Sequence, residues 1–265
     1  MSLAVLGMTF GYTIFVWWFS TGAIVWLDRR PQHTHGLSFA LVTCIAAAAL
    51  AGVFASLDDH TTTGAVLGFT SAVGLWGWHE ASFLMGGVTG PRVAPCPPDA
   101  SLGQRFKLAA ATLIYHEAAL VVTLVFLGMV ISGHANTVGF WTFALLFVAR
   151  LSAKLNLFFG VPNFSLEFFP PRLAYLATYL GKAKRNAVFP VSVAAGLLAL
   201  WLEVRMVSAA SASAADVVGG SLVMALTALA LLEHGFMVAP IPDAALWRWA
   251  LSSHRKAAGA PTLDL

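Results

Sequence analysis

The chain has 265 residues, of which 58% are hydrophobic and 10% charged, and its formal net charge is +3. Its mean hydropathy of +0.79 excludes a water-soluble domain, because a fold of this length could not bury so much apolar surface. The sequence lacks the short alternating strands of a transmembrane barrel, and its basic residues lie in separate loops rather than in a nucleic-acid-binding patch.

Apolar segments long enough to cross a bilayer follow one another along the chain. A helix of roughly 20 apolar residues spans the hydrocarbon and satisfies its own backbone hydrogen bonds. The sequence therefore predicts an all-α fold, a polytopic transmembrane bundle of about seven helices that forms a single domain over residues 1–265. The spans are expected at residues 3–27, 37–57, 64–85, 106–131, 138–159, 188–207 and 217–238, followed by a short cytoplasmic tail at 239–265.

Basic residues occur mainly in alternate connections between the predicted spans. Arg29 and Arg30 follow the first span and Arg92 follows the third, whereas the opposite connections carry acidic residues such as Asp58 and Asp59. Lysine and arginine are enriched in cytoplasmic loops of membrane proteins. The pattern therefore predicts an N-terminus outside and a C-terminus in the cytoplasm.

The connection between the fifth and sixth predicted spans has an amphipathic segment of its own. It begins after Pro170-Pro171, runs from Arg172 to Leu180 and ends at Gly181. Tyr175 and Tyr179 are one helical turn apart and suit the membrane–water boundary. We predict a cytoplasmic interfacial helix here, although the same pattern also fits an ordinary loop helix that covers the end of the bundle.

Ionisable side chains interrupt four of the predicted spans. Such groups are costly at membrane depth unless they are paired or hydrated, so each one needs a physical explanation. The alternating direction of the spans places all of them at a similar depth in the cytoplasmic half. They are His79 and Glu80 in the third span, His116 and Glu117 in the fourth, Arg150 and Lys154 in the fifth, and Glu233 and His234 in the seventh.

One interpretation of these residues is structural. Arg150 and Lys154 are four residues apart and share a helix face, so they can present two positive charges to neighbouring helices. The carboxylates of Glu80, Glu117 and Glu233 could neutralise them. The five side chains would then form an intramembrane polar network that sets the register of the helices.

Two further interpretations involve a ligand. Histidine and glutamate can bind iron or zinc, but neighbouring residues on a helix point about 100° apart and the Glu-x-x-His spacing of di-iron bundles is absent. A single imidazole is enough to provide an axial ligand for a tetrapyrrole. His79, His116 and His234 are the candidate cofactor-binding residues.

Several motifs indicate a family. The segment 150–163, the block 167–193, the triplet Trp78-His79-Glu80 and the C-terminal stretch 233–249 are similar to the PuhE family of photosynthetic complex assembly proteins from purple phototrophic bacteria. In the fourth span the family pattern has a pair of histidines, whereas this sequence has His116-Glu117. The difference leaves the role of Glu117 open.

The resemblance implies a multi-pass protein of the cytoplasmic (inner) membrane that supports assembly of the photosynthetic reaction centre and core antenna. Its expected partners are membrane lipid, subunits of these complexes and other assembly factors, and bacteriochlorophyll is a possible ligand of the three histidines. Asn156, Asn163 and Glu167 would form a cytoplasmic mouth where a partner docks. A non-enzymatic role is favoured; the alternative is an intramembrane metalloenzyme that acts on a tetrapyrrole or lipid.

Overall fold

The computed structural model describes residues 2–181, 183 and 186–251, and every regular element in this part of the chain is a helix. The prediction of an all-α fold is thus confirmed. The α-helices are α1 (Leu3–Asp28), α2 (His35–Ser56), α3 (Thr62–Leu84), α4 (Leu102–Ala111), α5 (Ile114–Val130), α6 (Val138–Phe159), α7 (Val188–Val207), α8 (Ala214–Phe236) and α9 (Arg248–Leu251). Short 3-10 helices are η1 (Gln32–Thr34), η2 (Leu166–Phe168), η3 (Pro171–Tyr179) and η4 (Asp243–Trp247).

Fewer helices than predicted have the length and the apolar composition expected of a membrane span. Among the described residues, five helical segments are long and apolar enough to cross a membrane, or six if the bent pair α4 and α5 counts as one span. The five are α1, α2 with η1, α6, α7 and α8. The remaining predicted span, α3, is 23 residues long, but Thr, Ser and Gly interrupt its apolar residues. The expectation of about seven spans is therefore met only in part.

The fourth predicted span, 106–131, is a broken helix. α4 ends at Ala111, α5 begins at Ile114, and the two axes differ by 65°. The carbonyl oxygen of Thr89 accepts the backbone N–H groups of Tyr115 and His116, both at 3.0 Å, and these donors have no partner within the first turn of α5. A Cβ on Gly90 would clash with the Ala111 carbonyl oxygen, so only glycine allows this approach. The preceding loop thus caps α5 and stabilises the break.

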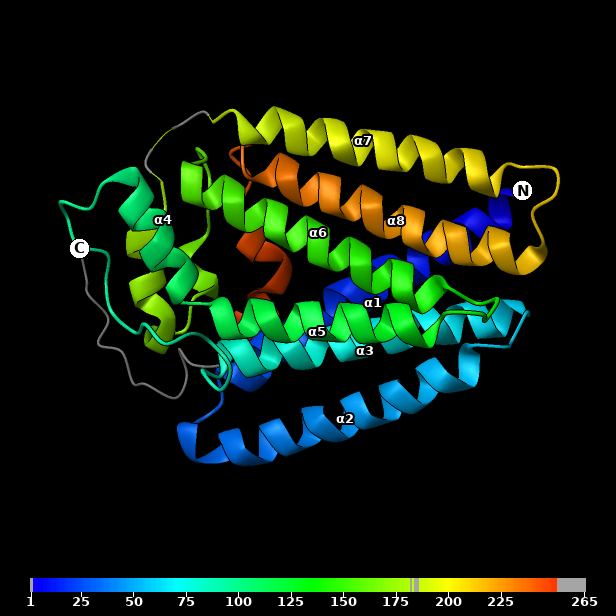
Figure 1. Cartoon of the computed structure of the whole chain (residues 1–265), viewed down its shortest axis with the longest axis horizontal. Helices are drawn as coiled ribbons and strands as arrows, with labels where there is room; N and C mark the ends of the chain where they lie inside the picture. Colours follow the sequence, from blue (N-terminus) through cyan, green and yellow to red (C-terminus); the bar gives the residue numbers. More distant parts are fainter. Residues whose placement is uncertain (1, 182, 184–185, 252–265) are drawn as a thin grey trace.

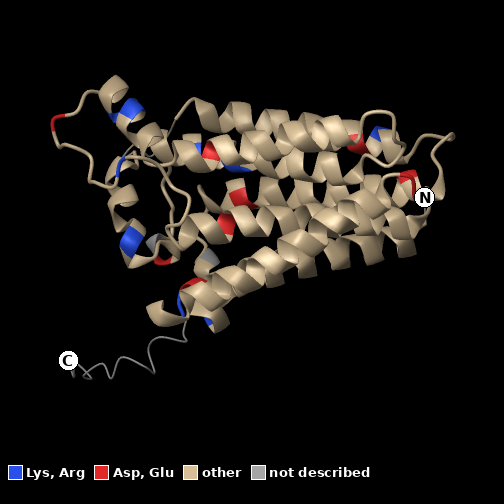
Figure 2. Cartoon of the chain, turned by 60° about the horizontal axis from the view of Figure 1, so that its bottom comes forward, with Lys and Arg blue, Asp and Glu red and all other residues tan. Residues whose placement is uncertain are grey.

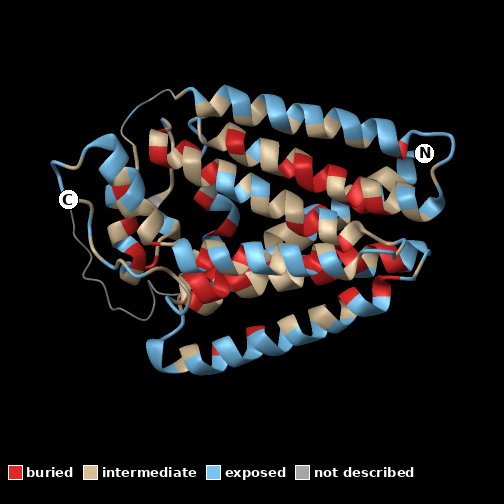
Figure 3. Cartoon of the chain, in the orientation of Figure 1, coloured by how far each residue is buried: buried red, intermediate tan, exposed pale blue. Residues whose placement is uncertain are grey.

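α3 lies inside the bundle, whereas α2 and α7 lie at opposite edges of it (Figure 1). Figure 3 shows the buried residues gathered on the inner helices and mostly exposed residues on α2 and α7. Glycine allows close packing at the centre, since a Cβ on Gly139 of α6 would lie 3.1 Å from the Gly68 carbonyl oxygen of α3. Glycine at these two positions therefore lets α3 and α6 approach each other closely.

Charged residues lie mainly towards the end of the bundle that carries α4 and η3, and long uncharged stretches of helix separate this end from the other (Figure 2). Arg172 of η3 donates to Asp28 of α1 across 2.6 Å, and Arg105 of α4 donates to the Phe158 carbonyl oxygen of α6 at 2.9 Å. This distribution follows the alternation seen in the sequence. The orientation of the bundle in the membrane stays a prediction.

The segment predicted as an interfacial helix is the 3-10 helix η3. A 3-10 helix has three residues per turn, so side chains three positions apart lie above one another. Leu173, Leu176 and Tyr179 have this spacing, and all three are buried. Leu173 and Leu176 pack on Phe83 of α3. η3 therefore covers the end of the bundle, as in the alternative interpretation, and its contact with the membrane surface stays a prediction.

The first part of the predicted C-terminal tail, 239–265, packs against α1. The Trp247 ring lies 5.1 Å from that of Trp17, and its indole N–H donates to the Trp18 carbonyl oxygen at 2.9 Å. Trp18 in turn donates to the Leu246 carbonyl oxygen at 2.8 Å. η4 and α9 thus belong to the bundle, while residues 252–265 lie outside the described residues.

Candidate functional site

A cavity of about 390 Å³ lies inside the bundle, between α1, α3, α6 and α8. Most of its wall is apolar and aromatic, with Trp76, Phe83 and Trp247 among the lining residues. Its volume is at the lower end of the range for small-molecule sites, roughly 300–1,000 Å³. One region of the wall is charged, and it is formed by Glu80, Arg150, Lys154 and Glu233.

Arg150 and Glu80 form an ion pair on this charged wall. The Nη2 atom of Arg150 on α6 lies 3.2 Å from Oε2 of Glu80 on α3. The Arg150 side chain keeps 49% of its surface accessible, against 11% for Glu80. Arg150 is also one of the residues that line the cavity. The other carboxylate oxygen of Glu80, Oε1, is buried and has no hydrogen-bond partner.

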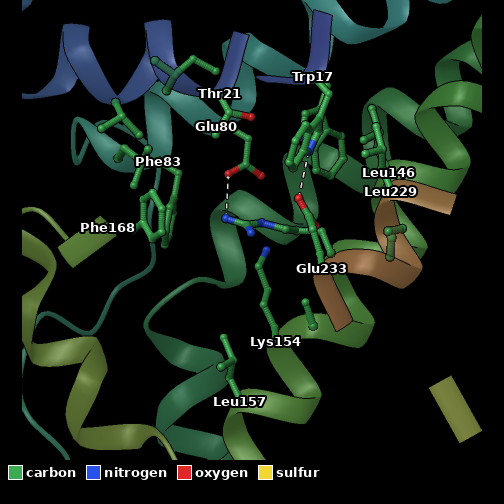
Figure 4. A pocket seen from close by; sticks show the side chains of 18 of the residues that line it. Trp17, Thr21, Glu80, Phe83, Leu146, Lys154, Leu157, Phe168, Leu229 and Glu233 are labelled. Carbon is green, nitrogen blue, oxygen red and sulfur yellow. Dashed lines mark hydrogen bonds and ion pairs between the residues drawn. The ribbon is translucent and has the colours of Figure 1, made fainter. Parts of the chain in front are cut away.

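Lys154 and Glu233 complete the charged wall. Lys154 follows Arg150 by one turn of α6, and its Nζ atom lies 2.5 Å from Oε1 of Glu117 on α5. Glu233 of α8 accepts a hydrogen bond from the indole N–H of Trp17 on α1 at 2.9 Å. Figure 4 shows Glu80, Lys154 and Glu233 directed towards one space. The structure thus brings the side chains of the expected polar network together, from four helices.

The histidines predicted as cofactor ligands do not line the cavity. His79 Nε2 lies 2.9 Å from the Thr123 hydroxyl of α5. His234 uses both ring nitrogens, with Nε2 2.9 Å from the Ser152 hydroxyl and Nδ1 2.8 Å from the Ala230 carbonyl oxygen. Both imidazoles therefore connect neighbouring groups of the bundle.

His116 has a different environment. It is 1% exposed, and neither of its ring nitrogens has a hydrogen-bond partner. Its ring centroid lies 4.7 Å from that of Phe83. An axial ligand must direct an imidazole nitrogen into the space that the macrocycle occupies. Since none of the three histidines lies on the cavity wall, the site does not fit a tetrapyrrole whose metal is held by histidine.

Metal ligation by the histidine–glutamate pairs also lacks a geometric basis. Over the described ranges, no three or more His, Cys, Asp or Glu side chains are grouped in a way that could hold a metal ion. Glu80 and Glu117 are each paired with a cation of α6 instead. This arrangement offers no support for an iron or zinc centre.

The three residues predicted for the cytoplasmic mouth lie in different environments. Asn163 lines the cavity, and its side-chain amide donates to the carbonyl oxygens of Phe236 and Ala239, both at 2.8 Å. Asn156 is fully buried and donates to the Ser192 hydroxyl of α7 at 2.9 Å. The backbone carbonyl oxygen of Glu167 accepts a hydrogen bond from Arg29. Asn163 is thus the one of the three that borders the cavity.

Sequence reasoning missed the contribution of the aromatic residues at the two ends of the chain. Trp17 orients Glu233, and Trp247 lines the cavity from the segment expected as a tail. Tryptophan is common at membrane interfaces, so the occurrence of these residues carried no specific signal. The one available hint was that an intramembrane carboxylate such as Glu233 needs a donor on another helix.

The long apolar helices, packed in a bundle with ion pairs between its members, define a multi-pass helical membrane protein. The model of one protein family, described as "Protein of unknown function (DUF3623)", matches residues 3–258. The chain belongs to this family.

A protein of Rhodobacter capsulatus, named "Uncharacterized 30.4 kDa protein in puhA 5'region", is 45% identical over 251 residues, which cover 91% of this chain and 89% of that protein. No solved structure matches the chain. The relative's name points to the puh locus and is in keeping with the resemblance found in the sequence. The narrower assignment to PuhE stays a prediction.

Proposed function

We propose that this chain is an assembly factor of the cytoplasmic membrane for the photosynthetic reaction centre and core antenna, and that it holds an amphiphilic molecule during assembly. The observation that carries this proposal is the apolar cavity with a charged wall inside a bundle of membrane-crossing helices. The name of the Rhodobacter capsulatus relative supports the link to photosynthesis. Bacteriochlorophyll is the candidate molecule, of which the cavity could enclose only a part, and subunits of these complexes are the candidate partners.

The cavity suits binding better than it suits chemistry. Its apolar wall can bind the apolar part of a molecule that is already dissolved in the bilayer. The charged region can orient one polar group of the same molecule. The charged side chains are held by partners on other helices, so they are preorganised for binding. Since no histidine lines the wall, a pigment would be held through its periphery and its shape, without an axial imidazole.

A cavity-filling variant tests this function in a purple phototrophic host that lacks the gene. Ala149 lines the cavity, so Ala149→Phe should occupy part of the space. We expect cells with this variant to contain severalfold less reaction centre and core antenna than cells with the wild type, measured by near-infrared absorption of membranes. Ala195→Phe on the exposed face of α7 is the matched control, and it should restore normal amounts.

Accumulation of the protein must be equal in both strains, as judged by immunoblotting. Full assembly with Ala149→Phe, or normal assembly without the gene, would contradict the proposed function. Purified wild-type protein should also carry more pigment than Ala149→Phe. A stoichiometric metal that is lost in His116→Ala would instead favour the metalloenzyme alternative.

A further inference from the structure

The charged wall of the cavity offers hydrogen-bond donors that the protein itself does not use. A guanidinium has five N–H donors and an ammonium has three. Within the described ranges, Arg150 donates only through Nη2, to Glu80, and Lys154 donates only to Glu117. The remaining donors of Arg150 belong to a side chain with 49% of its surface accessible. The wall is therefore suited to a ligand group that accepts hydrogen bonds.

The charges around the cavity indicate that this ligand group is neutral. On the wall, the carboxylates of Glu80 and Glu233 balance the cations of Arg150 and Lys154, and Lys154 is also paired with Glu117. A bound anion would compete with carboxylates already in place. A bound cation would meet the two cations of α6 on the same wall. A carbonyl oxygen accepts hydrogen bonds and brings no net charge.

The apolar wall defines the rest of the ligand. Trp76, Phe83 and Trp247 line the cavity together with aliphatic side chains, and they can pack on a ring or a hydrocarbon chain. The cavity thus combines one polar contact region with an extended apolar surface.

We infer that the cavity binds a neutral amphiphile through a carbonyl oxygen that accepts hydrogen bonds from Arg150. This inference rests on the proposed function, in which the bundle holds an amphiphile, and it specifies the chemical class and the recognition residue. The keto and ester carbonyls of a chlorophyll-type pigment have this chemistry, and so does the head of an isoprenoid quinone. The experiment must distinguish these two sources.

The test uses the full chain in lipid nanodiscs and a photoreactive long-chain methyl ketone. The matched probes are the alkane and the fatty-acid carboxylate of the same chain length. After irradiation, mass spectrometry locates the label, and titration gives the apparent affinity. We expect the ketone to label cavity-lining residues of α1, α3, α6 or α8 at about tenfold lower concentration than either matched probe. Equal or stronger labelling by the carboxylate or the alkane would overturn the inference.

A double variant and a control variant test whether Arg150 binds the ketone. Arg150→Met alone would leave the Glu80 carboxylate without its cation and could fail to fold, so it is combined with Glu80→Gln. We expect the double variant to fold and to bind the ketone about tenfold more weakly. Arg205→Met is the control, because Arg205 lies over the Trp201 ring on the exposed side of α7. Undiminished binding by the folded double variant would refute the role of Arg150.

Competition with the bound ketone distinguishes the pigment from the quinone as the natural ligand. Displacement of the ketone by bacteriochlorophyll supports the inference with the pigment as ligand, displacement by an isoprenoid quinone supports it with the quinone as ligand, and displacement by neither contradicts it. The outcome is independent of the assembly experiment. Ketone binding through Arg150 in a protein without effect on assembly would overturn only the proposed function, whereas assembly that needs the cavity but not Arg150 would overturn only this inference.

Discussion

α7 and α8 are consecutive helices of similar length and hydropathy, but they occupy opposite environments. They have 20 and 23 residues, and their most apolar windows have hydropathies of 1.6 and 1.9. In these windows, 0% of the residues of α7 are buried, against 50% of those of α8 (Figure 3). In a membrane, an apolar side chain can face lipid or protein at a similar free energy. Hydropathy therefore does not decide which helix is central.

Small and polar residues account for the difference. α8 buries Gly219, Ser221 and Thr227, which allow neighbouring helices to approach or bond to it. α7 exposes large aliphatic residues such as Leu197 and Leu198. Within this helix, all of which the structure describes, only Val207 at the last position is buried. The comparison predicts that equal substitutions in the two helices have unequal effects.

The largest difference is expected for leucine-to-alanine substitutions. Leu222 of α8 is 0% exposed and Leu198 of α7 is 57% exposed. Leu222→Ala should lower the free energy of unfolding by about 2–5 kcal/mol, because it leaves a cavity among packed side chains. Leu198→Ala should change it by less than about 0.5 kcal/mol. Unfolding of both variants in mixed detergent micelles, followed by circular dichroism, measures the difference, and similar losses would show that α7 is also packed against protein.

An intermediate effect is expected at a glycine of α8. A Cβ on Gly219 would lie 2.5 Å from Cγ2 of Val138, whereas a Cβ on Gly235 would meet nothing within 4 Å. Gly219→Ala should therefore destabilise the protein by about 1–3 kcal/mol through overpacking. Gly235→Ala should be neutral or stabilising by up to about 1 kcal/mol, since alanine favours the helix. The melting temperatures of the two variants in one detergent measure this difference. A Gly219→Ala variant as stable as the wild type would mean that α6 and α8 are packed less closely than the structure shows.

The smallest effect is expected at a polar contact between α7 and α8. The Thr227 hydroxyl of α8 donates to Glu203 of α7 at 2.8 Å. Thr227→Val removes this bond and should cost about 0.6 kcal/mol, the average for such bonds between membrane helices. Glu203→Gln keeps a carbonyl acceptor and should cost less. Chemical unfolding of the single and double variants gives the coupling energy, and a coupling of zero would show that the contact between Thr227 and Glu203 does not stabilise the packing of α7 on α8.

Helix positions were predictable where each apolar run matches one helix. Residues 138–159 and 188–207 were expected as spans, and they coincide with α6 and α7. The break between α4 and α5 was not predictable, because it depends on the Thr89 carbonyl and on the close approach at Gly90. Both groups come from a loop that the apolar pattern leaves unspecified.

The charged part of the candidate site could be expected from energetics alone. Ionisable groups inside spans need partners of opposite charge or hydrogen-bonding groups. Glu80 pairs with Arg150, and Glu117 pairs with Lys154. The roles of the histidines could not be derived in this way. His79 and His234 bond to hydroxyl groups on other helices, and such neutral partners leave no periodic signal in the sequence.

A helical membrane bundle whose intramembrane charges meet follows from the amino-acid pattern, because the cost of unpaired polar groups in hydrocarbon holds whatever the detailed packing. In contrast, the packing of the folded chain sets which helices are central, where the fourth span breaks and which side chains face the cavity. These features depend on close contacts between residues far apart in the chain, such as Gly68 with Gly139 and Trp17 with Glu233. The rotation of each helix about its own axis sets these contacts, and in an apolar solvent hydropathy does not constrain that rotation.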